Sequence, residues 1–350
     1  MKVLVTGHTG YIGAVLVPML IEEDHVVTGL DTDFYAGCDF VGQLAEVPAM
    51  SKDLRDVAVD DLREFDAVIH LGALSNDPLS DLNPGLTYEI NHRASVRLAE
   101  LAKAAGVPRF LFSSSCSLYG LSEGADLLAE NASFNPVTPY GESKVLVERD
   151  VSRIADDTFS PTFLRNSTAY GVSPRLRADL VVNNLVGFAY TTGEVLIASD
   201  GTPWRPLVHV EDICRAFLAV LEAPRELVHN QPFNVGQTRE NYQIRDIAEM
   251  VRDVVPGSRI QYAEGGGPDL RCYRVNCDKI AQTLSNFKPQ WTVARGVEQL
   301  YEAYKEHGLT VGEFTGSRYI RIKQLKSLLA MDQLDGRLRW RDPSTSSFRP

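Results

Sequence analysis

The chain has 350 residues, of which 44% are hydrophobic and 23% charged, the ordinary balance of a globular protein with a large core. Its net charge of -11 argues against a nucleic-acid or anionic-membrane surface, although a few arginines could still bind a phosphorylated small molecule. We find no secretory signal, no run of roughly 20 apolar residues and no metal-ligand spacing among the cysteines and histidines, so we expect a reduced, cytoplasmic, metal-free protein.

The first residues combine an apolar strand pattern with a glycine-rich turn. Lys2–Thr6 is a short apolar run of the kind that forms a buried parallel strand. The turn Gly7-His-Thr-Gly10-Tyr-Ile-Gly13 follows, and the pattern over 14–21 predicts a helix. A strand, a glycine turn and a helix in this order make a cradle in which backbone N–H groups and the helix dipole face a phosphate. Glycines at this spacing also occur in ordinary turns.

The next segment adds an acidic residue at a dinucleotide-binding distance. A strand is predicted over 25–30 and is followed by Asp31. An acid about 20 positions after a glycine turn suits the ribose hydroxyls of NAD and repels the extra phosphate of NADP. The alternative is a strand-end Asp that caps a turn. Further strands are predicted around 44–47 and over 66–71, and the second of these ends at the small pair Gly72-Ala73.

Strands and helices continue to alternate as far as residue 165. The patterns predict helices over 91–105 and 140–154 and strands over 109–112 and 160–165. This alternation predicts an α/β fold with a doubly wound parallel (Rossmann) sheet. The polar residues 113–117 follow a strand, and the carboxyl end of a strand is where such sheets bind ligands.

Tyr140 and Lys144 begin the helix predicted over 140–154, and Pro139 suits its first turn. The two side chains are one turn apart on the same helix face. A phenol titrates near ~10, and a neighbouring ammonium favours its ionised form, so the pair could act as a general acid/base on a hydroxyl. A surface Tyr and Lys on a solvated helix is the alternative.

The second half of the chain is less regular. Helices are predicted over 176–189, 210–221, 244–255, 293–304 and about 320–330, and strands over 193–198, 233–236 and 258–263. We find no repeat, low-complexity tract or long linker.

From Met1 to about Tyr304 the chain resembles the extended short-chain dehydrogenase/reductases, and within them the nucleotide-sugar epimerases and dehydratases. The motifs that carry this resemblance are Thr6–Gly13, Asp31, Asp53-Leu54, Ser113–Ser115 with Leu118–Gly120, Tyr140 with Lys144, Leu164-Arg165 with Ala169–Gly171, Asp200–Arg205 with Val208–Asp212, and Pro268–Arg271.

The resemblance implies NAD as the cofactor, a nucleoside-diphosphate sugar as the substrate, and a homodimer held by a four-helix bundle of helices 91–105 and 140–154. It implies a Rossmann NAD-binding domain of residues 1–171 plus about 206–236. The remainder, about 172–205 plus 237–350, is expected to form a smaller mixed α/β substrate domain.

Individual residues take their expected roles from the same resemblance. Tyr140, Lys144 and Ser115 match the catalytic residues. The residues expected to bind NAD are Gly7, Gly10, Tyr11, Ile12, Gly13, Asp31, Asp53, Leu54, Leu71, Ala73, Asn91, Ser113, Tyr140 and Lys144. Those expected to bind the substrate are Ser115, Ser117, Thr168, Asn183, Arg205 and Arg271. Surface ion pairs are the alternative for the two arginines, and solvent contact is the alternative for Asn183.

Three departures from the family pattern bear on the reaction. Cys116 and Ser117 stand where dehydratases keep an acid/base pair, and a neutral thiol and a hydroxyl replace it poorly. Thr168 and Asn276 stand where Asn and Asp are common. We therefore predict an NAD-dependent nucleotide-sugar epimerase, with a 4,6-dehydratase, decarboxylase or 4-ketoreductase as alternatives and an NAD-sensing binding module as the non-enzyme alternative.

Overall fold

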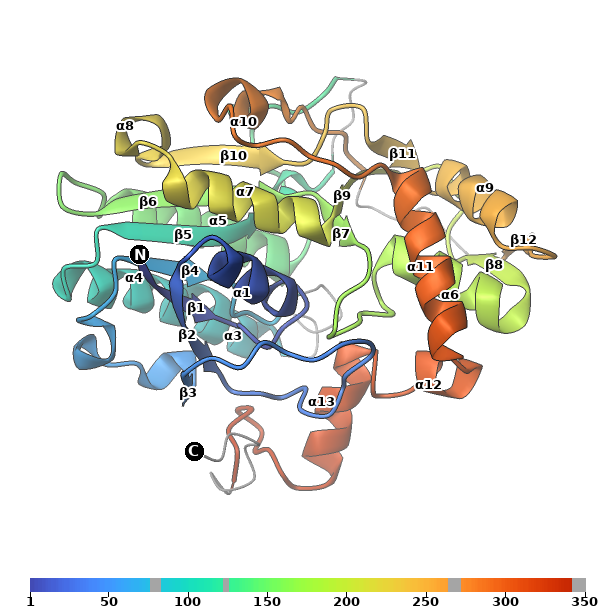
Figure 1. Ribbon diagram of the computed structural model, residues 1–350, viewed down its shortest axis with the longest axis horizontal. Coiled ribbons are helices and arrows are strands. Elements are labelled where there is room, and N and C mark those ends of the chain that lie inside the picture. Colours follow the sequence, from blue (N-terminus) through green and yellow to red (C-terminus); the bar gives the residue numbers. More distant parts are fainter. Residues whose placement is uncertain (76–82, 122–125, 264–271, 342–350) are drawn as a thin grey trace.

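The computed structural model describes residues 1–75, 83–121, 126–263 and 272–341 (Figure 1). Within these ranges, parallel strands form a seven-stranded sheet in the order β10-β6-β5-β4-β1-β2-β3. The strands are β1 (Lys2–Thr6), β2 (Val26–Asp31), β3 (Ala49–Ser51), β4 (Ala67–His70), β5 (Arg109–Ser115), β6 (Ser160–Asn166) and β10 (Gln231–Val235). The predicted doubly wound α/β fold is confirmed.

Helices cover both faces of this sheet. In Figure 1, α1 (Gly13–Glu22) and α7 (Val210–Glu222) lie in front of it, and α4 (Ser95–Ala104) and α5 (Pro139–Ser152) lie behind it. Successive strand residues point to opposite faces, so Val3 and Val5 pack with α1 and α7 while Leu4 packs with α4 and α5. Burial on both faces explains why the strands are continuous apolar runs.

Several predicted elements differ from the observed ones. No strand covers 44–47; the edge strand β3 is formed by the next segment, Ala49–Ser51. The helix predicted over 91–105 begins as α3 (Pro84–Thr87) and continues as a π-helix, Tyr88–Ala94, before α4. The helix predicted from 176 begins only at Val181, because the preceding residues form an irregular segment along a cavity.

A second hydrophobic core lies beside the large sheet. It is built around helices α6, α9 and α11 and two small sheets, β11-β9-β7 and β12-β8. The bounds are β7 (Thr168–Tyr170), α6 (Val181–Thr192), β8 (Glu194–Ile197), β9 (Trp204–His209), β11 (Asn241–Gln243), α9 (Ile244–Val254), β12 (Arg259–Tyr262) and α11 (Val293–His307). The remaining helices are α8 (Arg225–Val228), α10 (Asp278–Thr283), α12 (Val311–Thr315) and α13 (Arg321–Ala330). The exact boundaries between a cofactor and a substrate domain stay a prediction.

The C-terminal segment returns to the first half of the chain. Leu325 and Leu328 of α13 belong to one buried cluster with Leu74, Leu86 and Ile90. Figure 1 shows α13 below the body of the molecule, near the labelled C-terminus. In the described part of the chain, no helix is long and apolar enough to cross a membrane.

Candidate functional site

A cavity of about 950 Å³ lies at the carboxyl ends of β1, β2, β4, β5 and β6. Most residues expected to bind cofactor or substrate line it. They are Gly7, Gly10, Tyr11, Ile12, Gly13, Asp31, Asp53, Leu54, Leu71, Ala73, Ser113, Ser115, Ser117, Tyr140, Lys144, Thr168 and Arg205. Residues from both halves of the chain therefore meet in one space, as the parallel sheet requires.

The glycine turn forms a tightly packed cradle at one side of this cavity. Gly7 has φ +73°, and a Cβ added there would lie 2.9 Å from the backbone N of Gly72. A Cβ on Gly13 would lie 2.4 Å from the carbonyl oxygen of Gly7. Both positions therefore need glycine so that the turn, β4 and the start of α1 can pack closely, and this strand–turn–helix arrangement fits a dinucleotide diphosphate.

Asp31 ends β2 beside this cradle. Its carboxylate accepts hydrogen bonds from the backbone N–H and hydroxyl of Thr9, at 3.2 and 2.8 Å, and from the N–H of Asp33 at 3.0 Å. A carboxylate has about four acceptor positions, so it retains capacity for a ribose hydroxyl. The turn-capping role considered above and a ribose-binding role are thus compatible in one side chain.

Tyr140 and Lys144 lie on one face of α5, which is well capped. The Thr138 hydroxyl accepts from the N–H of Gly141 at 3.2 Å, and Pro139 occupies the first turn. The Lys144 ammonium lies 5.5 Å from the Tyr140 ring centroid and donates to the carbonyl oxygen of Ser113 at 2.7 Å. Both side chains line the cavity, so the surface alternative does not describe them.

Lys144 is an unusual cation because it is 4% exposed. Burial lowers the pKa of its ammonium from the ordinary 10.5 to about 7, although Glu148 acts in the opposite direction. The group therefore changes protonation near neutral pH. An adjacent anion, such as an ionised phenol, would favour its charged form.

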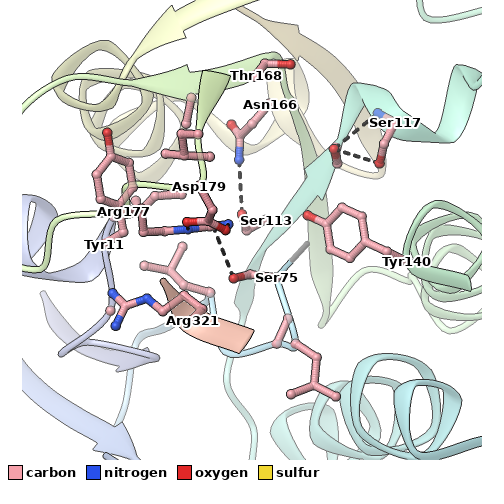
Figure 2. Close-up of a pocket in the computed structure, with 18 of the residues that line it drawn as sticks. Tyr11, Ser75, Ser113, Ser117, Tyr140, Asn166, Thr168, Arg177, Asp179 and Arg321 are labelled. Carbon is pink, nitrogen blue, oxygen red and sulfur yellow. Dashed lines mark hydrogen bonds and ion pairs between the residues drawn. The ribbon is translucent and has the colours of Figure 1, made fainter. Parts of the chain in front are cut away.

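The end of β5 and the residues directly after it supply hydroxyl groups to the part of the cavity that contains Tyr140, as Figure 2 shows for Ser113 and Ser117. Ser115 Oγ accepts from the N–H and hydroxyl of Ser117, at 3.1 and 2.9 Å. Asn166 donates to the Ser113 hydroxyl at 3.0 Å. Ser115 is thereby oriented as a hydrogen-bonding group for a reacting oxygen.

Cys116 does not face the reacting groups. Its thiol is fully buried and donates to the carbonyl oxygen of Arg165 at 3.1 Å. Burial raises the pKa of this thiol to about 12, so it stays neutral. This agrees with its interpretation as a small core residue rather than a nucleophile.

Two expected ligand residues lie elsewhere. Asn183 does not line the cavity; its amide accepts from the N–H of Gly171 at 3.0 Å and donates to the carbonyl oxygen of Arg177 at 3.0 Å. Asn91, expected to bind NAD, is buried and pairs with both backbone groups of Leu74. Both amides satisfy buried backbone groups instead of facing a ligand. Arg271 lies outside the described residues.

Other cavity residues had no signal in the sequence analysis. They are Tyr35, Ser75, Asn166, Arg177, Asp179 and Arg321. The segment Pro174–Asp179, which carries three charged residues shortly after β7, was the available hint for two of them. In the described residues no group of three or more His, Cys, Asp or Glu side chains could hold a metal ion.

Comparison with known proteins is consistent with this geometry. The model of the NAD dependent epimerase/dehydratase family matches residues 3–236. A UDP-glucose 4-epimerase of Lactobacillus helveticus is 30% identical over 319 residues, covering 83% of this chain and 92% of that protein. The Homo sapiens UDP-glucose 4-epimerase is 27% identical over 338 residues, covering 86% and 94%. The structure of MoeE5 in complex with UDP-glucuronic acid and NAD matches with a TM-score of 0.76 at 26% identity, covering 87% of this chain and 99% of MoeE5.

Proposed function

The chain belongs to the NAD dependent epimerase/dehydratase family, and on this premise we propose that it is an NAD-dependent epimerase of a nucleoside-diphosphate sugar. The observation that carries the proposal is that the pair Tyr140 and Lys144 lines, together with Ser115, a cavity that also contains a glycine cradle. Relatives named UDP-glucose 4-epimerase support this choice and make UDP-sugars the first substrates to test.

The proposed chemistry needs one acid/base group and does not require a second pair of acid/base residues. Tyr140 takes the proton of a sugar hydroxyl and later returns it, while the Lys144 cation favours the phenolate form. Ser115 hydrogen-bonds the reacting oxygen and holds it in place. Bound NAD would supply the redox step, accepting a hydride from the same carbon and giving it back on the other face of the sugar.

In the part of the chain that the structure describes, the absence of a carboxylate next to Ser115 favours epimerisation over dehydration. Among the described residues that line the cavity, the carboxylates are Asp31, Asp53 and Asp179. The first two lie towards the glycine cradle, and Asp179 is paired with Arg177 at 2.7 Å. Ser115 is followed by Cys116 and Ser117, and these two residues offer only a buried thiol and a hydroxyl. A 4,6-dehydratase would need further acid/base groups there.

The substrate's diphosphate is expected to lie near Arg205, which is buried in the cavity wall. A cytoplasmic location and a homodimer through α4 and α5 are further parts of the proposal. Light scattering tests the second part, and a monomer at micromolar concentration would contradict it.

The test is a panel of nucleotide sugars incubated with purified protein in deuterium oxide. An inverted sugar without solvent deuterium indicates direct epimerisation at the oxidised carbon. Incorporated deuterium indicates enolisation beside the ketone, as in dehydration or epimerisation at a neighbouring carbon. Consumption of added NADH would instead indicate a ketoreductase.

The matched variant is Tyr140→Phe, which keeps the ring and removes only the hydroxyl. We expect turnover to fall by about 10³-fold or more while NAD affinity is retained. Near-normal turnover of this variant would refute the acid/base assignment.

A further inference from the structure

The cavity contains a second cluster of charged side chains that the proposed chemistry does not use. Arg177 and Asp179 come from the irregular segment before α6, and Arg321 is the first residue of α13. Figure 2 shows the three together on one side of the cavity, with Tyr140 on the other. The segments that supply them are more than 100 positions apart in the sequence, so only folding brings them together.

Arg177 is held in a defined position. Its Nε and Nη2 donate to the two carboxylate oxygens of Asp179, at 3.1 and 2.7 Å, and its Nη1 donates to the Ser75 hydroxyl at 3.3 Å. Bidentate pairing fixes the plane of the guanidinium as well as balancing its charge. The Arg177 side chain is thus fixed in position at the cavity surface, where it contacts Ser75 in the segment that follows β4.

Arg321 is less well satisfied. It is 3% exposed, its guanidinium carbon lies 3.8 Å from the ring centroid of Tyr35, and its Nη2 donates to the carbonyl oxygen of Arg175 at 3.2 Å. Its Nη1 is buried and has no hydrogen-bond acceptor within the described residues. A buried guanidinium with an orphan N–H is costly unless an anion completes its environment.

The neighbouring carboxylates are already engaged. Asp179 pairs with Arg177 at 2.7 Å, and Asp33 lies 3.7 Å from Arg175. Arg321 itself forms no ion pair with a carboxylate in the ranges that the structure describes. An anionic ligand in the cavity would therefore meet a guanidinium whose nearby carboxylate, Asp179, is shared with Arg177.

The cluster is tied structurally to the glycine cradle. The Asn183 amide donates to the Tyr11 hydroxyl at 3.4 Å and to the Arg177 carbonyl oxygen at 3.0 Å, so one buried side chain links the turn to the cluster. Ser75, the hydroxyl partner of Arg177, follows the cavity-lining residues Leu71–Leu74. The cluster and the cradle therefore line one cavity.

We propose that Arg321, with Arg177 beside it, is a diphosphate-binding residue that closes the cavity over a ligand lying on the glycine cradle. The expected ligand is the diphosphate of the dinucleotide; the same chemistry in the nucleotide sugar is the other possible source. This inference rests on the NAD binding of the proposed function and not on its epimerase chemistry.

The rest of the C-terminal segment holds Arg321 against the cavity wall. Trp340 donates to the carbonyl oxygen of Thr32 at 2.7 Å, and Arg339 lies 3.7 Å from the Asp53 carboxylate. Thr32 and Asp53 also line the cavity. The C-terminal segment therefore contacts residues that also line the ligand cavity. Binding of a ligand in the cavity and docking of the segment should stabilise each other.

The test uses the full chain freed of bound dinucleotide, with Arg321→Gln compared with Lys326→Gln. Lys326 is an exposed cation on the same helix. Calorimetric titrations with NAD, UDP and adenosine measure a dinucleotide, a nucleoside diphosphate and a ligand without phosphate. We expect Arg321→Gln to weaken NAD about ten- to a hundredfold, with adenosine and UDP unchanged and the Lys326 variant like wild type.

The other outcomes are equally informative. Weaker UDP with unchanged NAD would support the residue's role but assign it to the nucleotide sugar. Unchanged binding of both, or an equal loss of adenosine binding, would overturn the proposal. Failure of turnover alone would not, because binding is the readout.

A second variant separates ligand binding from a structural role. Arg321→Met keeps an unbranched apolar stem and removes the whole guanidinium, including the orphan donor. We expect the ligand-free variant to unfold at an unchanged or higher temperature, yet to gain less from NAD than wild type does. A lower unfolding temperature without ligand and a normal gain with NAD would indicate a structural arginine and overturn the proposal.

Discussion

Lys144→Met should make the ligand-free protein more stable while destroying the arrangement proposed for catalysis. Burial lowers the pKa of this ammonium from 10.5 to about 7, and that difference corresponds to about 5 kcal/mol of unfavourable free energy when the group is fully charged. At pH 7 about 4 kcal/mol of this cost is present. Loss of the hydrogen bond to the Ser113 carbonyl oxygen, 2.7 Å long, offsets about 1 kcal/mol. The net gain expected is about 3 kcal/mol.

The stability difference between Lys144→Met and the wild-type protein should depend on pH. Between the folded pKa near 7 and the unfolded value of 10.5, the unfolded chain keeps a proton that the folded protein has released. Wild-type stability therefore rises with pH in this window, and the methionine variant lacks this rise. The advantage of Lys144→Met should be largest at or below pH 7 and shrink by about 1.4 kcal/mol per pH unit above it.

Urea unfolding of the dinucleotide-free proteins at pH 6, 8 and 9 measures the effect, with exposed Lys326→Met as the control. A variant less stable than wild type at pH 6, or an advantage that does not change with pH, would refute the reasoning. If the prediction holds, Lys144 is a residue kept at a cost to stability, as is typical of catalytic groups.

Three further predictions concern the cofactor site and the core. Gly13→Ala places a Cβ 2.4 Å from the Gly7 carbonyl oxygen and should cost about 1–3 kcal/mol and weaken NAD, whereas Gly312→Ala, with open space around it, should be near neutral in thermal unfolding. Asp31→Ser should shift the NADP-to-NAD affinity ratio at least about tenfold towards NADP in titrations, and an unchanged ratio would contradict its ribose role. Glu148→Gln breaks a buried ion pair with Arg165, 2.7 Å long, and should cost about 3–5 kcal/mol in urea unfolding; a cost below 1 kcal/mol would show that the pair is dispensable.

Local patterns were sufficient for most of the sheet and for the core of the site. β1 was predicted to the residue because the apolar run Val3–Val5, flanked by Lys2 and Thr6 and followed by a glycine turn, is typical of a buried parallel strand. Tyr140 and Lys144 face one cavity because four-residue spacing on a capped helix leaves no other relative orientation. Such features depend on neighbours in sequence, which a sequence displays directly.

The errors occurred where partners distant in sequence decide the outcome. Residues 44–47 have a strand-like pattern, yet the backbone that pairs with β2 is Ala49–Ser51, because register is set by the neighbouring strand. Asn183 was predicted to bind the substrate, but its amide oxygen accepts a hydrogen bond from the buried N–H of Gly171. A single sequence does not show which buried backbone groups lack partners.

The sequence by itself determined the doubly wound sheet, the glycine cradle and the Tyr140–Lys144 pair, since each follows from hydrophobic periodicity or short spacing. Only the tertiary structure decided how deeply Lys144 is buried, and hence the low pKa of its ammonium. It alone also decided that Arg321, in a tail without family resemblance, lies beside Arg177 at the cavity. Burial and long-range contact are properties of the packed chain, and they shape the electrostatics on which the proposed chemistry depends.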